Sequence, residues 1–409
     1  MIYEPYYLKD VHTASAQNKF NVISTFAGGG GSSTGYRLAG GKILCINEFV
    51  EEARNTYKEN YPDTKIIPDD IKKLSGQNFL DATGLKSGEL DLLDGSPPCS
   101  AFSMAGNVSH GRKNTHSDAF GKTKSYSDIK EVTNVEDLFF EYLRVANEIR
   151  PKVIIGENVA GLTFGRAYEY YGKIQNEFEK MGYDVSSKVL DSSKFGVPQT
   201  RSRLFFIGVR NDVTEKVGLN FMTISSIFPN ENKEVIVLKD ALIGLENDEE
   251  EVKTLTEKFS NTAYWKKTGR FMPTDPDRII RGDEYCNHDE KKPEHRSLGI
   301  QELKKTPEYR NGKYRLSHFN LKRVSQRKPS PTLTAMGSGD TTAGAFHWSE
   351  PRKLTLGELK RIQSLPDDFK LTGKWNQRAE RIGRMVPPLM LKAIAESVYE
   401  NVLKVYNNG

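Results

Sequence analysis

The fold of this chain is decided by residues 90–100, Leu90-Asp91-Leu92-Leu93-Asp94-Gly95-Ser96-Pro97-Pro98-Cys99-Ser100. The first four residues form a short apolar run that is typical of a buried strand. Pro97 and Pro98 fix their φ angles and remove two backbone donors, so the loop after the strand is stiff. This loop presents the thiol of Cys99 at the carboxyl end of a strand, where open α/β sheets place their chemistry. A buried structural cysteine is the alternative for Cys99 considered alone.

A strand, a glycine-rich turn and a helix start come before this loop. Residues 21–26 have the pattern of a first buried strand, residues 27–35 are rich in glycine, and a helical pattern starts at residues 36–39. Glycines let a ligand approach the backbone closely, and the amino end of a helix offers free N–H donors. A second predicted strand ends in Glu48, about 20 residues past the first glycine, where a carboxylate suits ribose hydroxyls. These features predict a nucleotide-type site.

The alternation of strands and helices continues to residue 209 and predicts an α/β fold. Helical patterns cover residues 51–61, 138–149 and 168–181, and strand patterns cover 152–156, 185–190 and 204–209. Glu157-Asn158-Val159 follows one of these strands, again at a carboxyl end. Asp70, with Ile71, either closes a third strand beside an adenine or caps the helix that follows. Both interpretations of Asp70 stay open at this point.

Composition limits the class of protein without naming a function. The 409 residues, with 37% hydrophobic and 28% charged, suit a soluble globular protein of two domains. There is no apolar run of membrane-spanning length and no signal-like start, so we expect a cytoplasmic protein that contacts no membrane. The three cysteines lack metal-ligand spacing, so we expect no metal site. A net charge of +5 permits nucleic-acid binding but does not indicate it.

Two segments fall outside the alternation. Residues 104–135 are long, basic and without apolar periodicity, which suits a mobile lid over a phosphate backbone or, alternatively, a disordered insertion. Residues 211 to about 325 mix basic and aromatic side chains, as a second domain that contacts phosphates and base edges requires.

Together these features resemble the C5-cytosine DNA methyltransferase family, of the bacterial modification-enzyme type. The motifs follow one fixed order over most of the chain: Phe26-Ala27-Gly28-Gly29-Gly30-Gly31, Glu48, Asp70-Ile71, Pro97-Pro98-Cys99, Glu157-Asn158-Val159, Gln199-x-Arg201-x-Arg203 and Gly383-x-x-Val386-Pro387. The resemblance implies a doubly wound, Rossmann-like, S-adenosylmethionine-dependent methyltransferase domain with a smaller inserted target-recognition domain. We divide the chain into a catalytic and cofactor-binding domain (1–210), a target-recognition domain and hinge (211–376) and a C-terminal segment that returns to the catalytic domain (377–409).

The resemblance also implies the chemistry. Cys99 adds as a thiolate to C6 of cytosine, which makes C5 nucleophilic toward the sulfonium cofactor. Glu157 holds the N3 and amine edge of the base. Arg201 and Arg203 steady the ring carbonyl or a phosphate, with a structural ion pair as the alternative for one of them. The target base is flipped out of the duplex, because its C5 atom is inaccessible within the stack.

Further residues are assigned to ligands by the same resemblance. S-adenosyl-L-methionine is expected to contact Phe26, Ala27, Gly28, Gly30, Gly31, Glu48, Asp70, Ile71, Pro98, Arg384 and Val386. Double-stranded DNA is expected to contact Ser103, Arg112, Lys113, Arg315 and Arg323. We expect a monomer, encoded by a bacterium or a phage, with an associated restriction endonuclease.

One departure from the family pattern concerns the cofactor. The family's Gly-Asn-x-Val-Pro stretch here reads Gly383-Arg384-Met385-Val386-Pro387. Two like charges about 4 Å apart cost about 4 kcal/mol at an effective dielectric constant of 20, so Arg384 beside a sulfonium needs compensation. Either Arg384 turns to solvent, DNA or a carboxylate such as Glu380, or the cofactor is carboxy-S-adenosyl-L-methionine and the product 5-carboxymethylcytosine. A smaller departure, Ser100 in place of Gln or Asn, is expected to have little consequence.

Three other functions compete with DNA cytosine methylation. A tRNA cytosine-5 methyltransferase has the same fold, but the long segment after residue 211 favours a DNA-reading domain. A catalytically silent DNA-binding protein has no need of Cys99, Glu157 and Arg201 together. A dinucleotide oxidoreductase leaves the Pro-Pro-Cys loop unexplained.

Overall fold

The computed structural model describes residues 3–98, 138–165, 167–220, 222–260, 322–334, 345–348, 350 and 352–409. The predicted lid at 104–135 and the predicted site residues Cys99, Ser103, Arg112, Lys113 and Arg315 lie outside these ranges, as does the side chain of Arg323. The roles given to them therefore stay predictions, as does the division of the chain into three units.

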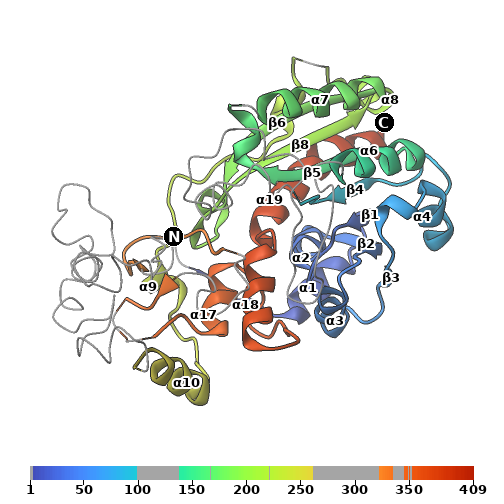
Figure 1. Ribbon diagram of the computed structural model, residues 1–409. Helices are drawn as coiled ribbons and strands as arrows, with labels where there is room; N and C mark the ends of the chain where they lie inside the picture. The colour runs from blue at the N-terminus through green and yellow to red at the C-terminus, as the bar shows by residue number, and fades with distance from the viewer. Residues whose placement is uncertain are drawn as a thin grey trace.

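A seven-stranded sheet organises the described part of the chain, with the strand order β3-β2-β1-β4-β5-β8-β6 (Figure 1). The strands are β1 (Phe20–Thr25), β2 (Gly41–Asn47), β3 (Lys65–Ile67), β4 (Leu92–Gly95), β5 (Val153–Val159), β6 (Tyr183–Asp191) and β8 (Ser202–Arg210). The pairs from β3 through to β5 are parallel, which brings the carboxyl ends of these strands to one edge of the sheet. The predicted doubly wound α/β fold is confirmed.

One strand runs against the others. β8 is antiparallel to both of its neighbours, β5 and β6. Residues 192–201 connect β6 to β8, with the short helix η5 (Ser192–Phe195) and strand β7 (Gln199–Thr200) among them. A parallel crossover needs a dozen or more residues and usually a full helix, so this connection is too short for one. The strand pattern of residues 204–209 gave no information on this direction.

Helices cover both faces of the sheet, as the alternation of buried strand residues shows. Val22 and Leu92 join one hydrophobic cluster, which includes α1 (Leu8–Ser15), α2 (Gly31–Leu38) and α3 (Glu51–Asn60). Ile23 and Leu93, each one residue further along its strand, join a second cluster. That cluster includes α4 (Gly76–Thr83), α6 (Leu138–Ile149) and α7 (Ala167–Lys180). Each inner strand is thus buried on both faces, which explains its continuous apolar run.

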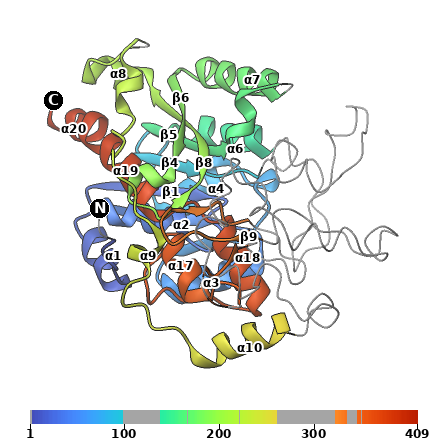
Figure 2. The same cartoon turned by 90° about the vertical axis from the view of Figure 1, so that its left-hand side faces the viewer.

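The C-terminal segment returns to the first face of the sheet, where α19 (Pro388–Val398) packs against α2 (Figures 1 and 2). The packing is close, because a Cβ atom on Gly35 would lie 2.5 Å from Leu391 Cβ. The predicted helix over residues 389–406 is present but interrupted by a π-helical turn, η7 (Tyr399–Leu403), before α20 (Lys404–Asn408).

The remaining described segments form short elements. Two small parallel pairs join β7 to β10 (Ser330–Pro331) and β9 (Lys322–Arg323) to β11 (Ala345–Phe346). The other helices are η1 (Ile71–Lys73), η4 (Ala160–Thr163), α8 (Asn211–Val217), η6 (Ile224–Ile227), α9 (Leu238–Ala241), α10 (Glu249–Ser260), α17 (Leu356–Ile362) and α18 (Trp375–Arg384). Within the described ranges, no helix combines the length and apolar character that a membrane crossing requires.

Candidate active site at the carboxyl edge of the sheet

The loop that leads to Cys99 begins between β1 and β5, at the carboxyl edge of the sheet. Gly95 packs against the ring of Tyr142, so closely that a Cβ atom there would lie 2.6 Å from a ring carbon. Asn158 Nδ2 donates to the carbonyl oxygen of Pro97 at 3.4 Å, which joins the loop to the end of β5. The two strand ends that the sequence singled out therefore lie side by side. Ser96 Oγ is buried there and has no hydrogen-bond partner among the described residues.

Glu157 and the two predicted arginines form one charged cluster at this edge. Arg203 Nε forms an ion pair with Glu157 Oε1 at 2.9 Å, and the Glu157 side chain is only 12% exposed. Arg201 is 3% exposed and donates through Nη1 to the carbonyl oxygens of Leu333 (3.2 Å) and Gly383 (3.0 Å). Arg203 thus forms the ion pair that the sequence left open for one arginine, and its partner is the predicted acid itself.

Burial places an electrostatic cost on these arginines. The pKa of Arg201 is lowered well below its ordinary value, first by burial and then by the charge of Arg203, against the opposing effect of Glu157. Burial also lowers the pKa of Arg203, and Glu157 again acts in the opposite direction. Arg201 Nε is buried without a hydrogen-bond partner in the described part of the chain. A buried donor of this kind is available to a bound ligand.

The predicted cofactor turn has a strained backbone. Phe26, directly after β1, has φ +52°, a value that bulky residues rarely adopt. Strain of this kind gathers at functional sites, where the surrounding structure enforces it. The helix after the turn starts at Gly31, earlier than the predicted 36–39, because Gly30 already caps it with φ +104°. That earlier start is a correction to the sequence prediction.

Glu48 lies against this turn. Its carboxylate accepts hydrogen bonds from the backbone N–H groups of Gly28 and Val50, both at 2.8 Å. Burial raises the pKa of Glu48, while these two N–H groups and the charges of Arg381 and Arg54 partly oppose the shift. A buried carboxylate beside a glycine turn has the chemistry to accept ribose hydroxyls, so the residues fit the predicted cofactor.

The glycines of the turn also serve packing. A Cβ atom on Gly31 would lie 2.7 Å from the carbonyl oxygen of Val386, and Gly29 faces Met385 and Arg381 in the same way. Gly28 is different, since a Cβ atom there would meet nothing within 4 Å. Ligand approach alone therefore does not account for the glycine run, because Gly29 and Gly31 leave room for the C-terminal segment to pack against the turn.

The remaining predicted cofactor residues occupy ordinary structural positions. Asp70 caps η1, with its Oδ1 accepting from Lys72 N at 3.0 Å, and Ile71 is buried. The N-cap interpretation of Asp70 is thus the one seen, and β3 ends before it, at Ile67. Ala27 and Val386 are buried and Pro98 is half-buried. Contacts of these residues with a cofactor stay predictions.

Arg384 has a carboxylate partner. Its Nε donates to Glu380 Oε1 at 2.8 Å, one helical turn earlier on α18, and Glu380 is buried. The structure therefore shows the protein-based compensation that the sequence offered as one of two alternatives.

Asp94 is a buried polar residue at this edge that the sequence analysis missed. It accepts hydrogen bonds from Ser24 Oγ at 2.6 Å and from Tyr36 OH at 2.9 Å. The signal that could have found it is a pair of polar residues inside apolar strands, Ser24 in β1 and Asp94 in β4. Isolated polar residues in strands carry no information on their partners.

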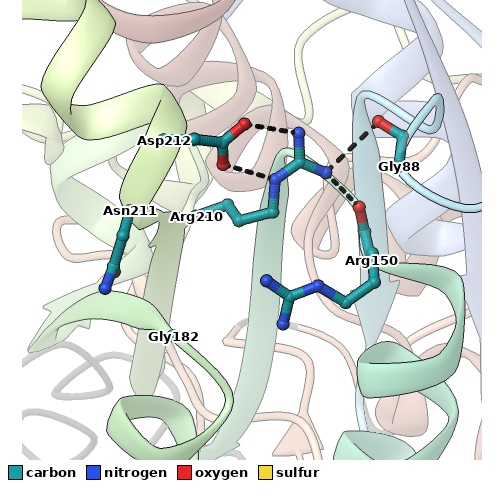
Figure 3. Close-up of a pocket in the computed structure, with 6 residues that line it drawn as sticks. All are labelled: Gly88, Arg150, Gly182, Arg210, Asn211 and Asp212. Carbon is teal, nitrogen blue, oxygen red and sulfur yellow. Dashed lines mark hydrogen bonds and ion pairs between the residues drawn. The ribbon is translucent and has the colours of Figure 1, made fainter.

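A pocket of about 500 Å³ lies at the opposite edge of the sheet, near the amino ends of β5 and β6 (Figure 3). Arg210 crosses it and forms two contacts with Asp212, Nε to Oδ1 at 2.6 Å and Nη2 to Oδ2 at 2.9 Å. Its remaining nitrogen donates to the carbonyl oxygens of Gly88 and Arg150. Open α/β sheets bind ligands at the carboxyl ends of their strands, so we place the candidate active site at the other edge.

Comparison with known proteins gives a consistent result. The family model described as C-5 cytosine-specific DNA methylase matches residues 20–400. The type II methyltransferase M1.HphI of Haemophilus parahaemolyticus is 30% identical over 386 residues, which cover 92% of this chain and 86% of that protein. The type II methyltransferase M.Eco47II of Escherichia coli is 28% identical over 402 residues, which cover 96% of this chain and 82% of that protein.

Solved structures share the fold. A prophage-encoded protein of Escherichia coli, described as a DNA modification methyltransferase, superposes with a TM-score of 0.61 at 22% identity and covers 94% of this chain and 99% of its own. The S. pombe Dnmt2 methyltransferase superposes with a TM-score of 0.54 at 16% identity, covering 93% and 98%.

Proposed function

This chain belongs to the C-5 cytosine-specific DNA methylases, and from that premise we propose that it transfers a methyl group from S-adenosyl-L-methionine to C5 of a cytosine flipped out of double-stranded DNA. The observation that carries the proposal is the charged cluster of Glu157, Arg201 and Arg203 beside Pro97, at the carboxyl edge of the sheet. Arg201 is buried, and the side chains of Glu157 and Arg203 are only 12% and 17% exposed. The residues at this edge suit a planar ring that carries adjacent donors and acceptors.

In the proposed mechanism, Cys99 adds as a thiolate to C6 of the cytosine, and the ring becomes an enamine that is nucleophilic at C5. Glu157 binds N3 and the exocyclic amine and limits the charge that develops on the ring. The ion pair with Arg203 holds the Glu157 carboxylate in place, and Arg201 supplies a buried positive field. S-adenosyl-L-methionine supplies an electrophilic methyl carbon. Loss of the C5 proton to a base and of Cys99 from C6 then restores the aromatic ring.

The proposed group transferred is methyl rather than carboxymethyl. The case for carboxymethyl transfer depends on an uncompensated positive charge at Arg384. The ion pair with Glu380 compensates that charge within the protein. No observation on the described residues favours the carboxylated cofactor.

The test is a nucleoside digest with mass analysis of duplex DNA treated with the protein, with Cys99→Ala as the blank. We expect 5-methylcytosine with S-adenosyl-L-methionine and no 5-carboxymethylcytosine with the carboxy derivative. The same treatment of tRNA is expected to leave its cytosines unmodified. Modified tRNA with unmodified DNA would favour the RNA enzyme, and DNA binding without modification would favour the silent binder.

The proposed setting is a bacterial or phage modification system. The relatives carry the printed name type II methyltransferase and come from bacteria, which supports a partner restriction endonuclease. A cytoplasmic location and a monomeric state are part of the same proposal.

A further inference from the structure

Asp94 is a buried carboxylate that the proposed mechanism does not use. It lies in β4, directly before the residues that lead to Cys99, and is 2% exposed. Ser24 Oγ donates to its Oδ2 at 2.6 Å, and Tyr36 OH donates to its Oδ1 at 2.9 Å. Thr25 Oγ1 donates to its carbonyl oxygen at 3.0 Å. Both carboxylate oxygens and the carbonyl oxygen thus have hydroxyl donors.

All of these donors come from the elements that carry the predicted cofactor turn. Ser24 and Thr25 are the last residues of β1, directly before the strained Phe26. Tyr36 lies in α2, the helix that starts at the end of the turn, and its side chain is fully buried. Asp94 therefore joins the strand of the predicted nucleophile loop to both elements that flank the cofactor turn.

The carboxylate at this position is unfavourable for stability. Burial raises the pKa of Asp94 to about 7, the hydrogen bonds from Ser24 and Tyr36 oppose the shift, and the charge of Glu157 adds to it. The titratable groups that face it are Tyr36 of α2, Glu157 of β5 and Tyr142 of α6. Buried charged groups are often replaced by apolar residues without loss of stability. A role other than stabilising the fold therefore accounts better for a carboxylate at this position.

Asp91 joins the same two strands at the opposite edge and provides a contrast. Its Oδ2 accepts from Asn21 N at 2.9 Å, and its own N–H donates to Asn21 Oδ1 at 2.9 Å. Lys152 Nζ pairs with its Oδ1 at 2.7 Å. Asp91 therefore provides a β1–β4 connection of similar size, with a cation as partner and without contact to the cofactor turn.

We propose that Asp94 is a positioning residue for methyl transfer, which fixes the start of the Pro-Pro-Cys loop relative to the cofactor turn. The inference rests on the proposed function, because the distance that matters is the one between the target base and the cofactor. A displacement of about 1 Å at a reacting centre costs on the order of 100-fold in rate. A hydrogen-bonded connection across β1, β4 and α2 is suited to prevent such a displacement.

The test compares Asp94→Ala, Asp94→Asn and Asp91→Asn with the wild-type chain. The measurements are the single-turnover rate constant for 5-methylcytosine formation, the dissociation constants of S-adenosyl-L-methionine and duplex DNA, and the thermal unfolding midpoint. Asp94→Ala removes both side-chain hydrogen bonds, so we expect its rate constant to fall about 10- to 100-fold. Both dissociation constants are expected to change by less than about threefold, well below that loss.

The two amide variants separate positioning from stability. Asp94→Asn keeps the shape and can still bond both hydroxyls, so it is expected to recover most of the rate. The amide of Asp94→Asn cannot ionise. A change in the wild-type rate constant around pH 7 that comes from titration of Asp94 is therefore expected to be absent from this variant. Asp91→Asn is expected to keep the wild-type rate and pH profile, even where its unfolding midpoint is lower. Equal rate losses in Asp94→Ala and Asp91→Asn, or none in Asp94→Ala, would overturn the inference.

The same set of proteins distinguishes this inference from the proposed function. A wild-type chain that forms no 5-methylcytosine contradicts the function, and hydrogen exchange then tests the connection alone. Asp94→Ala is expected to speed exchange at the amides of Gly95 and Ser96, and Asp91→Asn is not. Unchanged exchange at these two amides would overturn the positioning role whatever the activity.

Discussion

Two clusters, each of two arginines and one carboxylate, lie at opposite edges of the same sheet. At the carboxyl edge, burial lowers the pKa of both Arg201 and Arg203, and Arg201 Nε has no described partner. At the amino edge, Asp212 raises the pKa of Arg210, and Arg210 in turn lowers the pKa of Asp212. The direction of the arginine pKa shift separates the two clusters, because burial outweighs the carboxylate in the first cluster and the carboxylate outweighs burial in the second. Ionisable residues whose surroundings disfavour their charge mark functional sites more often than residues whose charges are well paired.

Backbone strain differs between the same two edges. Arg150, beside the pocket of Figure 3, has φ +56°, close to the +52° of Phe26. Arg150 follows the last residue of α6 and precedes Pro151, a position where a left-handed residue commonly ends a helix. Phe26 ends no helix, so its conformation lacks that local explanation. The difference again assigns function to the carboxyl edge.

The largest effect is expected from Glu157→Gln. The variant keeps the shape of the side chain but removes the charge that pairs with Arg203. The N3 and amine edge of the cytosine therefore loses its carboxylate partner. We expect the single-turnover rate constant of methyl transfer to fall about 10²- to 10⁴-fold. Asp212→Asn is the matched control at the other edge and is expected to leave the rate unchanged. A wild-type rate constant in Glu157→Gln would contradict the assignment of the active site to the carboxyl edge of the sheet.

A large effect on stability is expected from Asp94→Asn. The pKa of Asp94 is about 7 in the folded chain against an ordinary 3.8, so its ionisation destabilises the fold as the pH rises through this window. The amide does not ionise. The variant should therefore become more stable relative to wild type between about pH 4 and about pH 8, by up to about 4 kcal/mol. Denaturant unfolding over this range checks the sign, and a constant difference contradicts the prediction.

A moderate effect is expected at the cofactor turn from Glu380→Gln. Removing the carboxylate that pairs with Arg384 leaves more positive charge near the predicted sulfonium. We expect the dissociation constant of S-adenosyl-L-methionine to rise about tenfold, since about 1.4 kcal/mol corresponds to that factor. The double variant Glu380→Gln with Arg384→Asn should bind as tightly as wild type. Isothermal titration calorimetry decides, and unchanged affinity in Glu380→Gln would show that Arg384 lies away from the cofactor.

The smallest effect is expected from Asp212→Asn on stability. The carboxylate is more than half exposed, so solvent screens its pair with Arg210. Exposed ion pairs contribute up to about 1 kcal/mol, and the free energy of unfolding should fall by no more than that. Below the lowered pKa of Asp212 the pair is lost in the wild type as well, so the two proteins should converge in acid. A loss that persists in acid would indicate another role for Asp212.

The sequence predicted the strands and placed both Pro97-Pro98-Cys99 and Glu157-Asn158-Val159 at carboxyl ends of strands, because apolar runs and stiff turns are local signals. It also offered Glu380 as a partner for Arg384, since residues four apart on a helix face each other. The reversed direction of β8 left no trace in its strand pattern. Ser24 and Asp94 are 70 residues apart, and only the strand order brings them together. Contacts set by topology are outside what local patterns predict.

The contact of the glycine turn with the C-terminal segment has a consequence for protein synthesis. Gly31 and Gly35 face Val386 and Leu391, which leave the ribosome long after the two glycines do. Until they emerge, α2 has no partner for this side, and the cofactor turn lacks the packing that supports its strained backbone. Folding around the cofactor turn is therefore expected to wait for these residues, although the first strands of the sheet are made early. Nascent chains halted before residue 385 should thus bind no cofactor.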